Sequence, residues 1–509
     1  MLPFENLILI DKEQAIPVFR QITDRMIGLI RDGSLKPGVF LPGTRQMAQI
    51  LCVNRKTIIK SYDEMLGQNW IETIMRKGYR VMLDLPLIKP RSFQPRTSFV
   101  LKGHTDGFNI HTMDAMDAER SIRGSDILVD DGFPDPILSP YREINKTYAE
   151  EDRSLLPRQL LPTRPQGGTV AAKEATSTFL NDSRALNITA REIIMTRGGK
   201  MPLYLAANIL VEKGDVVALS DKSDTLTKEI FEHAGAQIVE VVTDEQGIQP
   251  RSLEEILSKK TIKLLYLVPH CHYPTTAVMS SERRRKLLSM MTAYDFWIIE
   301  DDNGYDFHHK NSPILPIASL AHNGKLIYIG SFDRVISSCV RVGFFVASPE
   351  VIGKAIRLQG LIDQHGDIHM EHMLLRMIEN GGLERHIMRS KKMYTNRCGL
   401  ICGLLEQKIG HLIDFTVPEA GLAVYIRFDD HFPIETFINE TSSKGLFFNA
   451  EIFHDLGHNA EKAIRFGFAS LSAREIERAV DIMAKAICKL DTLGEKNRLK
   501  NVGFSAMSA

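Results

Sequence analysis

The sequence lacks long apolar runs. The longest ones, such as that around Leu264 to Pro269, have the length of a strand and fall far short of the roughly 20 residues that a membrane span requires. The first thirty residues also lack the basic start and continuous apolar stretch of a signal peptide. We therefore expect no membrane partner and a cytoplasmic protein.

Cysteine and net charge are equally uninformative. The six cysteines form no CxxC pair and no histidine cluster accompanies them, which excludes a disulfide framework and predicts no metal site. Lys and Arg together number 63, as do Asp and Glu, so a nucleic-acid partner does not follow from charge. Residues 1–84 hold a small local excess, with twelve basic against nine acidic side chains. At 509 residues, at least two domains are expected.

Residues 17–82 show the pattern of three helices followed by a hairpin. Helical spacing and end signals predict helices over 17–33, 41–51 and 52–66, and Asn54 is placed to cap the third. A strand pair over 70–82 turns at Arg76, Lys77 and Gly78, where basic groups suit a phosphate backbone. The third helix opens with the polar and basic groups that a recognition helix presents to base edges, namely Arg55, Lys56, Thr57 and Lys60. Any one of these charges alone is more often part of a solvated helix face.

Taken as a string, these residues resemble the winged helix-turn-helix of the GntR family. The matching motifs are the Leu-Lys-Pro-Gly turn, Leu-Pro-x-x-Arg, Val-x-Arg-x-Thr and Gly-Tyr-x-Val, within residues 12–82. The resemblance implies a domain over 1–84 that binds double-stranded DNA. Its implied DNA-contacting positions are Arg45, Arg55, Thr57, Lys60 and Gly78.

The rest of the chain divides into a linker, a large domain and a tail. Residues 85–125 have no sustained period and are typical of a linker. Residues 126–490 alternate strand-length apolar runs with helical segments, which predicts an α/β fold with a mostly parallel sheet covered by helices on both faces. Residues 491–509 read as a frayed polar end.

Several predicted strands end in distinctive residues, and ligands of such sheets bind at the carboxyl ends of strands. A Gly-Gly turn at Thr196-Arg-Gly-Gly-Lys can offer backbone N–H groups to a phosphate. Asp301 ends an apolar strand, where a carboxylate needs a charged partner or a ligand. Arg465 lies within another apolar strand.

This region resembles a fold-type I aminotransferase with a smaller C-terminal α+β part. With the GntR segment ahead of it, the chain resembles the MocR branch of GntR regulators over about 12–490. The resemblance implies pyridoxal phosphate held as a Schiff base on a lysine, and a homodimeric domain that senses a small effector. The implied cofactor and effector positions are Gly198, Gly199, Lys200, Tyr273, Asp301, Ser331, Arg341 and Arg465, with Asp301 on the pyridinium nitrogen, Ser331 and Arg341 on the phosphate, and Arg465 on a substrate carboxylate.

The sequence departs from that family at four cofactor contacts. The Schiff-base lysine position is Arg334, whose guanidinium stays protonated and cannot form the bond. Asp224 stands near the expected stacking aromatic, Asn303 at an expected tyrosine, and Gly199-Lys200 at an expected Ser-Gln. We therefore expect no catalytic residue and no covalent cofactor. Lys200 as a substitute amine is the minor alternative.

Three hypotheses remain open at this point. The favoured one is a DNA-binding transcription regulator whose aminotransferase-like domain senses a ligand. The second is a pyridoxal-phosphate-dependent aminotransferase with an appended DNA-binding domain, and the third is a purely structural dimerisation module. In the favoured case Arg334 either pairs with Asp301, which fills the site from within, or grips a small anionic effector.

Overall fold

The computed structural model divides the chain into two compact units, Met1–Ala118 and Glu119–Ala509. The residues it describes are 3–11, 16–75, 77–85, 126–151, 166–309, 313–364, 366–448 and 462–505. The linker expected over 85–125 lies outside the described residues except for Leu85, and Arg76 of the expected hairpin tip lies outside them too. Among the described residues, no helix is long and apolar enough to cross a membrane.

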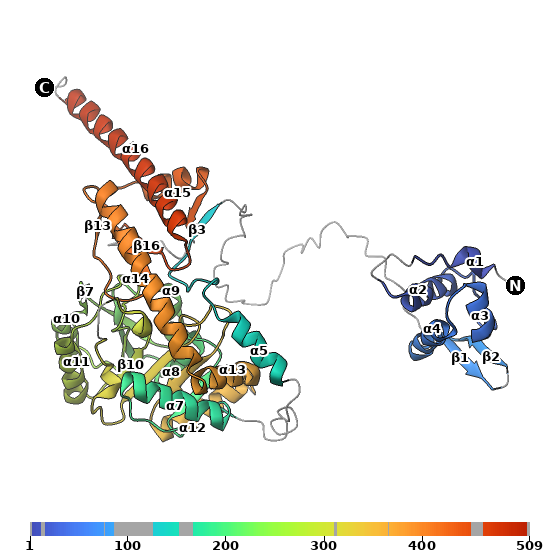
Figure 1. Cartoon of the computed structure of the whole chain (residues 1–509). Helices are drawn as coiled ribbons and strands as arrows, with labels where there is room; N and C mark the ends of the chain where they lie inside the picture. Colours follow the sequence, from blue (N-terminus) through green and yellow to red (C-terminus); the bar gives the residue numbers. More distant parts are fainter. Residues whose placement is uncertain are drawn as a thin grey trace, which may run out of the picture. The chain divides into compact units, whose positions relative to one another are not determined.

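The N-terminal unit consists of helices followed by a two-stranded antiparallel sheet (Figure 1). Its elements are α1 (Phe4–Leu7), α2 (Val18–Arg31), α3 (Thr44–Ile50), α4 (Arg55–Gly67), β1 (Ile71–Ile74) and β2 (Gly78–Val81). Ile22 and Met26 of α2 pack with Ile58 of α4 in one apolar cluster. The Asn54 side chain accepts a hydrogen bond from the Lys56 backbone N–H at 2.9 Å, which confirms the predicted cap of α4.

The second unit is built on a seven-stranded mixed sheet in the order β4-β12-β11-β10-β9-β5-β6. The strands are β4 (Ile193–Thr196), β5 (Val216–Ser220), β6 (Gln237–Val241), β9 (Leu264–Leu267), β10 (Trp297–Asp301), β11 (Leu326–Ser331) and β12 (Gly343–Val346). Strand β12 pairs antiparallel with both neighbours, and the other neighbouring pairs are parallel. The expected parallel sheet is therefore interrupted by one reversed strand.

Helices cover both faces of this sheet, because alternate residues of its strands join two different apolar clusters. Ile298 of β10 packs in the larger cluster, whereas its neighbour Ile299 packs in the smaller one. The larger cluster takes residues from α7 (Val170–Arg184), α10 (Pro250–Leu257), α11 (Ser281–Tyr294), α13 (Ile368–Glu379) and α14 (Gly382–Ile409). The smaller cluster takes residues from α8 (Lys200–Leu210), α9 (Thr225–His233) and α12 (Pro349–Ile362).

The C-terminal part adds a three-stranded antiparallel sheet in the order β13-β14-β16, with a long helix after it (Figure 1). Its elements are β13 (Asp414–Phe415), β14 (Ala423–Arg427), α15 (Ile434–Ser443), β15 (Leu446–Phe448), β16 (Ala463–Gly467) and α16 (Ala473–Ser505). Strand β15 pairs in parallel with β3 (Ile127–Val129) from the start of the unit. Because α16 continues through Ser505, most of the segment expected as a frayed end is helical instead.

Short elements complete the second unit between these larger ones. They are α5 (Tyr141–Glu151), the two-stranded pair β7 (Thr243–Asp244) and β8 (Gly247–Ile248), and the short 3-10 helices η1 (Tyr305–Phe307) and η2 (Ile317–Ser319).

Candidate ligand site at the carboxyl edge of the sheet

Strand β10 ends in three consecutive carboxyl groups that the pleat sends to opposite faces of the sheet. Asp301 is directed to the face of Tyr266, whose hydroxyl donates a hydrogen bond to Asp301 Oδ2 at 2.8 Å. Asp301 Oδ1 accepts from the Asn303 backbone N–H at 3.1 Å. Burial raises the pKa of Asp301, and the Tyr266 hydrogen bond opposes that rise. Asp301 thus has neutral hydrogen-bond partners where the sequence led us to expect a charged partner or a ligand.

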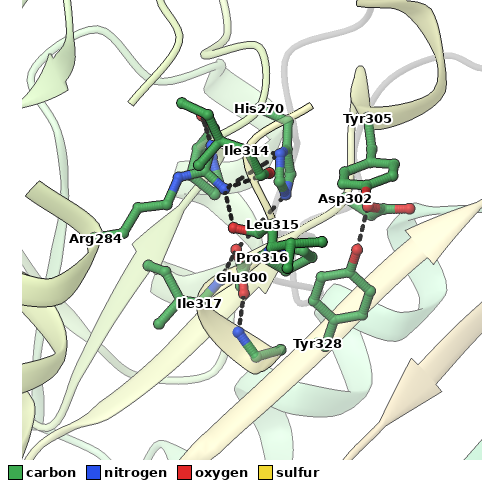
Figure 2. A network of polar contacts seen from close by, with 12 residues as sticks. His270, Arg284, Glu300, Asp302, Tyr305, Ile314, Leu315, Pro316, Ile317 and Tyr328 are labelled. Atoms are coloured by element: carbon green, nitrogen blue, oxygen red, sulfur yellow. Dashed lines mark hydrogen bonds and ion pairs between the residues drawn. The ribbon is translucent and has the colours of Figure 1, made fainter. Parts of the chain in front are cut away.

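Glu300 and Asp302 face the other side, in a buried polar network that sequence reasoning missed (Figure 2). Glu300 accepts hydrogen bonds from the Ile317 and Ala318 backbone N–H groups at 2.9 and 2.8 Å, and burial raises its pKa to about 7. Asp302 lies 2.8 Å from Arg184 Nη2 and accepts a hydrogen bond from the Tyr328 hydroxyl. The pattern of apolar runs did not indicate this network, because Arg184, which pairs with Asp302, comes from α7, far from β10 in the sequence.

Arg284 closes the network next to Glu300, and Figure 2 shows its guanidinium beside His270 and the backbone of Ile314 and Leu315. The guanidinium donates to the carbonyl oxygens of Pro269 at 2.9 Å and Leu315 at 2.8 Å. Burial lowers the pKa of His270 well below its usual value, so this imidazole is neutral. These contacts fix the loops at the end of β9 and β10 rather than opening them to a ligand.

The Gly-Gly turn after β4 lies against the residues expected at phosphate positions. Gly198 has φ of +69°, and a Cβ there would stand 2.8 Å from Arg341 Nη2. A Cβ on Gly199, the residue before α8, would stand 3.3 Å from Ser331 Cβ. The positive φ of Gly198 favours glycine at that position. The structure therefore brings Gly198, Gly199, Ser331 and Arg341 together, but Arg341 Nη1 also lies 3.7 Å from Asp333 Oδ2.

Lys200 is tied to Asp224 at the start of the next helix. Its ammonium lies 3.0 Å from Asp224 Oδ1 and 3.1 Å from Thr227 Oγ1. Asp224 also caps α9, accepting from the Thr227 backbone N–H at 2.9 Å. Burial would raise the pKa of Asp224, but the Lys200 charge and these hydrogen bonds outweigh it and lower the pKa. The acidic residue that replaces an expected aromatic thus has a local role as a helix cap.

Arg334 does not pair with Asp301, so that part of the sequence prediction is wrong. Its Nη2 lies 3.4 Å from Asp131 Oδ2, and its Nη1 donates to the Gly132 carbonyl oxygen at 2.9 Å. Its guanidinium carbon is 4.1 Å from the centre of the Phe133 ring. The partner is thus a turn that follows β3.

Arg465 on β16 meets the same aspartate. Its Nε lies 3.0 Å from Asp131 Oδ1, and its Nη1 donates to the Pro274 carbonyl oxygen at 2.6 Å. The guanidinium carbon is 5.0 Å from the centre of the Tyr273 ring. Arg334, Arg465 and Tyr273 are therefore brought together around Asp131, a residue that the sequence did not single out.

A small cavity of about 20 Å³ lies beside this group, lined in part by Asp224, Tyr266 and Tyr273. A buried site of that volume has room for about one water molecule. Among the described residues, no three His, Cys, Asp or Glu side chains are grouped so that they could hold a metal ion.

In the N-terminal unit, the basic residues expected to contact DNA lie on the surface. Arg45, Arg55, Lys56, Lys60 and Lys77 are exposed, while Thr57 and Gly78 are half-buried. Arg55 Nε donates to Thr44 Oγ1 at 3.3 Å, which joins the first turns of α4 and α3. Lys60 Nζ lies 4.0 Å from the centre of the Phe19 ring. The start of α4 therefore presents two neighbouring exposed basic side chains, Arg55 and Lys56, on a capped helix.

Comparison with known proteins places these features in a family context. Residues 143–483 match the family described as aminotransferase class I and II. The chain is 23% identical over 498 residues to the probable rhizopine catabolism regulatory protein MocR of Rhizobium meliloti, covering 96% of this chain and 97% of that protein. It is 24% identical over 453 residues to the HTH-type pyridoxine biosynthesis transcriptional regulator PdxR of Corynebacterium glutamicum, covering 88% and 91%. Among solved structures, an archaeal alanine:glyoxylate aminotransferase matches with a TM-score of 0.67 and 26% identity, over 72% of this chain and 91% of that one.

Proposed function

This chain belongs to the aminotransferase class I and II family and has the organisation of the MocR-type GntR regulators, and from that premise we propose that it is a DNA-binding transcription regulator whose large domain senses a ligand and does not catalyse transamination. The observation that carries the proposal is Arg334. An arginine stays protonated and cannot become the amine that anchors pyridoxal phosphate. Here the side chain is engaged with Asp131, Gly132 and Phe133.

The donors around the site do not fit a covalently held pyridoxal phosphate. Lys200, the other candidate amine, forms an ion pair with Asp224 and a hydrogen bond with Thr227. Asp333 beside Arg341 places a carboxylate where a dianionic phosphate would bind. When bound to a competent enzyme, the cofactor stabilises negative charge on the amino acid carbon. We infer that this chain uses the inherited site to recognise a small anionic effector instead.

The DNA-binding half of the proposal rests on the N-terminal unit. We infer that α3 and α4 form a helix-turn-helix and that the β1–β2 hairpin is its wing, with double-stranded DNA as the partner. The exposed Arg55 and Lys56 on the first turn of α4 support base reading there, and exposed Lys77 at the hairpin tip supports a phosphate contact. Two half-sites of an operator require two such units, which favours a homodimer.

The alternative function is a working aminotransferase with an appended DNA-binding domain. To separate the regulator from the enzyme, the purified chain is incubated with pyridoxal phosphate and reduced with borohydride. The mass of the intact chain is then measured by mass spectrometry. We expect no pyridoxyl group on the chain and no transfer of an amino group to a 2-oxo acid. Arg334→Lys restores one of four altered contacts, so it should trap the cofactor weakly and still show negligible turnover. A reduced adduct on the unmodified chain together with turnover would favour the enzyme.

A further inference from the structure

Asp131 lies between two arginines that come from distant parts of the chain. Its carboxyl oxygens are 3.0 Å from Arg465 Nε and 3.4 Å from Arg334 Nη2. The Asp131 side chain is 6% exposed and that of Arg465 is 4% exposed. A buried aspartate with two guanidinium partners has the surroundings that a bound carboxylate ligand would have.

The turn that carries Asp131 is held closely against the C-terminal sheet. Asp130 Oδ1 accepts from the backbone N–H groups of Gly132 at 2.8 Å and Phe133 at 3.1 Å. Gly132 has φ of +87°, and a Cβ there would stand 3.2 Å from the Leu422 backbone. The Gly467 backbone N–H donates to the Asp130 carbonyl oxygen at 2.9 Å. We call residues 130–133 the latch.

Of the two carboxyl groups in the latch, Asp131 is the one that faces the arginines. Two guanidinium groups that keep their charge meet the Asp131 carboxyl group, while the Asp130 carboxyl group accepts from backbone N–H groups of the latch. Cys271 and Tyr273, which also act on Arg465, stay neutral because burial raises the pKa of each. The Arg334 side chain is 30% exposed, so an anion from solvent can reach it.

We propose that the Asp131 carboxylate is an internal ligand of a two-arginine site, and that a small dicarboxylate binds between Arg334 and Arg465 by displacing it. This inference rests on the proposed sensing role of the large domain. Once Asp131 leaves, the site carries two positive charges, which a dicarboxylate neutralises and a monocarboxylate does not. Because arginine forks bind carboxylates through paired hydrogen bonds, both ends of such a ligand can be recognised.

Competition with Asp131 sets the affinity of the free ligand. A ligand that binds only the open site has its apparent affinity reduced by the fraction of molecules that are open. If no more than roughly one molecule in ten is open, removal of the internal carboxylate should strengthen binding at least roughly tenfold. Ligand binding would therefore release the latch from its contacts with the two arginines.

The test is titration calorimetry on the full chain with glutarate, a five-carbon dicarboxylate, and with its neutral diamide as a control compound. Glutarate should bind Asp131→Asn at least roughly tenfold more tightly than it binds the parent chain. The diamide should bind neither the variant nor the parent chain. The matched control is Asp135→Asn, which removes a carboxylate of the same segment from a different buried pair, 2.8 Å from Arg397 Nη2. Asp135→Asn should leave the glutarate affinity within about twofold of the parent.

A second measurement needs no substitution, in case Asp131→Asn does not fold. Hydrogen exchange of the parent chain should show faster exchange in residues 130–133 with saturating glutarate than with the diamide at equal ionic strength. Equal affinities of Asp131→Asn and the parent, or slower exchange of the latch with glutarate, would overturn the inference. Operator DNA binding, measured separately by fluorescence anisotropy, tests the proposed function, so either idea can fail while the other stands.

Discussion

Arg184 offers a quantitative test of the buried network that supports the site. Its guanidinium lies 2.8 Å from Asp302 and 2.6 Å from Asp306, and its carbon is 4.3 Å from the centre of the Tyr305 ring. Arg184→Met keeps much of the apolar volume but leaves both carboxyl groups without their cation. Breaking a buried pair in this way costs about 3–5 kcal/mol of unfolding free energy. We expect a loss in that range at pH 7.

The loss should depend on pH in a direction that the network fixes. Burial raises the pKa of Asp302 to about 6, although the Arg184 charge opposes the rise. Without Arg184 the pKa of Asp302 rises further, so above pH 6 the folded variant holds a proton that the folded parent has released. Unfolding releases that proton, and the loss in stability should therefore grow by about 1.4 kcal/mol per pH unit above pH 6.

Urea denaturation followed by tryptophan fluorescence measures this loss. The chain has two tryptophans, and a Trp70→Phe background leaves Trp297 at the start of β10 as the reporter. The matched control is Arg197→Met, because Arg197 also pairs with two aspartates but its side chain is 49% exposed. The Arg197→Met control should lose less than about 1 kcal/mol of unfolding free energy. A loss below about 1 kcal/mol for Arg184→Met, or one that stays constant from pH 6 to 8, would refute the reasoning.

Three further outcomes are expected. Arg55→Ala should weaken binding to the cognate operator by about 1–3 kcal/mol, while Lys77→Ala should weaken all DNA sequences alike and flatten the salt dependence; equal losses of both variants on cognate and random DNA would contradict this division. Sedimentation velocity at micromolar concentration should find a homodimer, and a monomer would remove that part of the proposal. Because burial raises the pKa of Glu300 to about 7 from 4.5, the folded chain binds a proton more tightly than the unfolded chain. Stability should thus fall by about 3 kcal/mol as pH rises from 4.5 through 7, and Glu300→Gln should remove that part of the slope in a thermal unfolding series.

Local features were predictable from the sequence because their causes are local. Asn54 caps α4 as expected, since the cap depends on residues two positions apart. Strand β9 also lies within the apolar run around Leu264 to Pro269, because such a run can be buried on both faces of a sheet. The reversal of β12 was not predicted, since strand direction depends on how the chain returns to the sheet and not on the run itself.

The partners of the arginines were not predictable, because they depend on contacts across the whole unit. Asp131 and Arg465 are 334 positions apart, and nothing in the turn after β3 distinguishes Asp131 from its acidic neighbour. A pair between Arg334 and Asp301 was one of two alternatives, but Arg334 contacts Asp131 and Gly132 instead, while Tyr266 donates to Asp301. Departures from a family motif thus identified Arg334 as unusual, but only the fold shows what it contacts.

The pleat at the end of β10 also separates two groups of contacts. Asp301 faces Tyr266 on one side, whereas Glu300 and Asp302 face the buried network on the other side of the sheet. Side chains on opposite faces share few neighbours, so changes at one have little effect on the other. Substitution of Asp301 should therefore leave the contacts of Glu300 and Asp302, which hold the end of the strand, in place. The contacts on the two faces of one strand can thus change independently of each other.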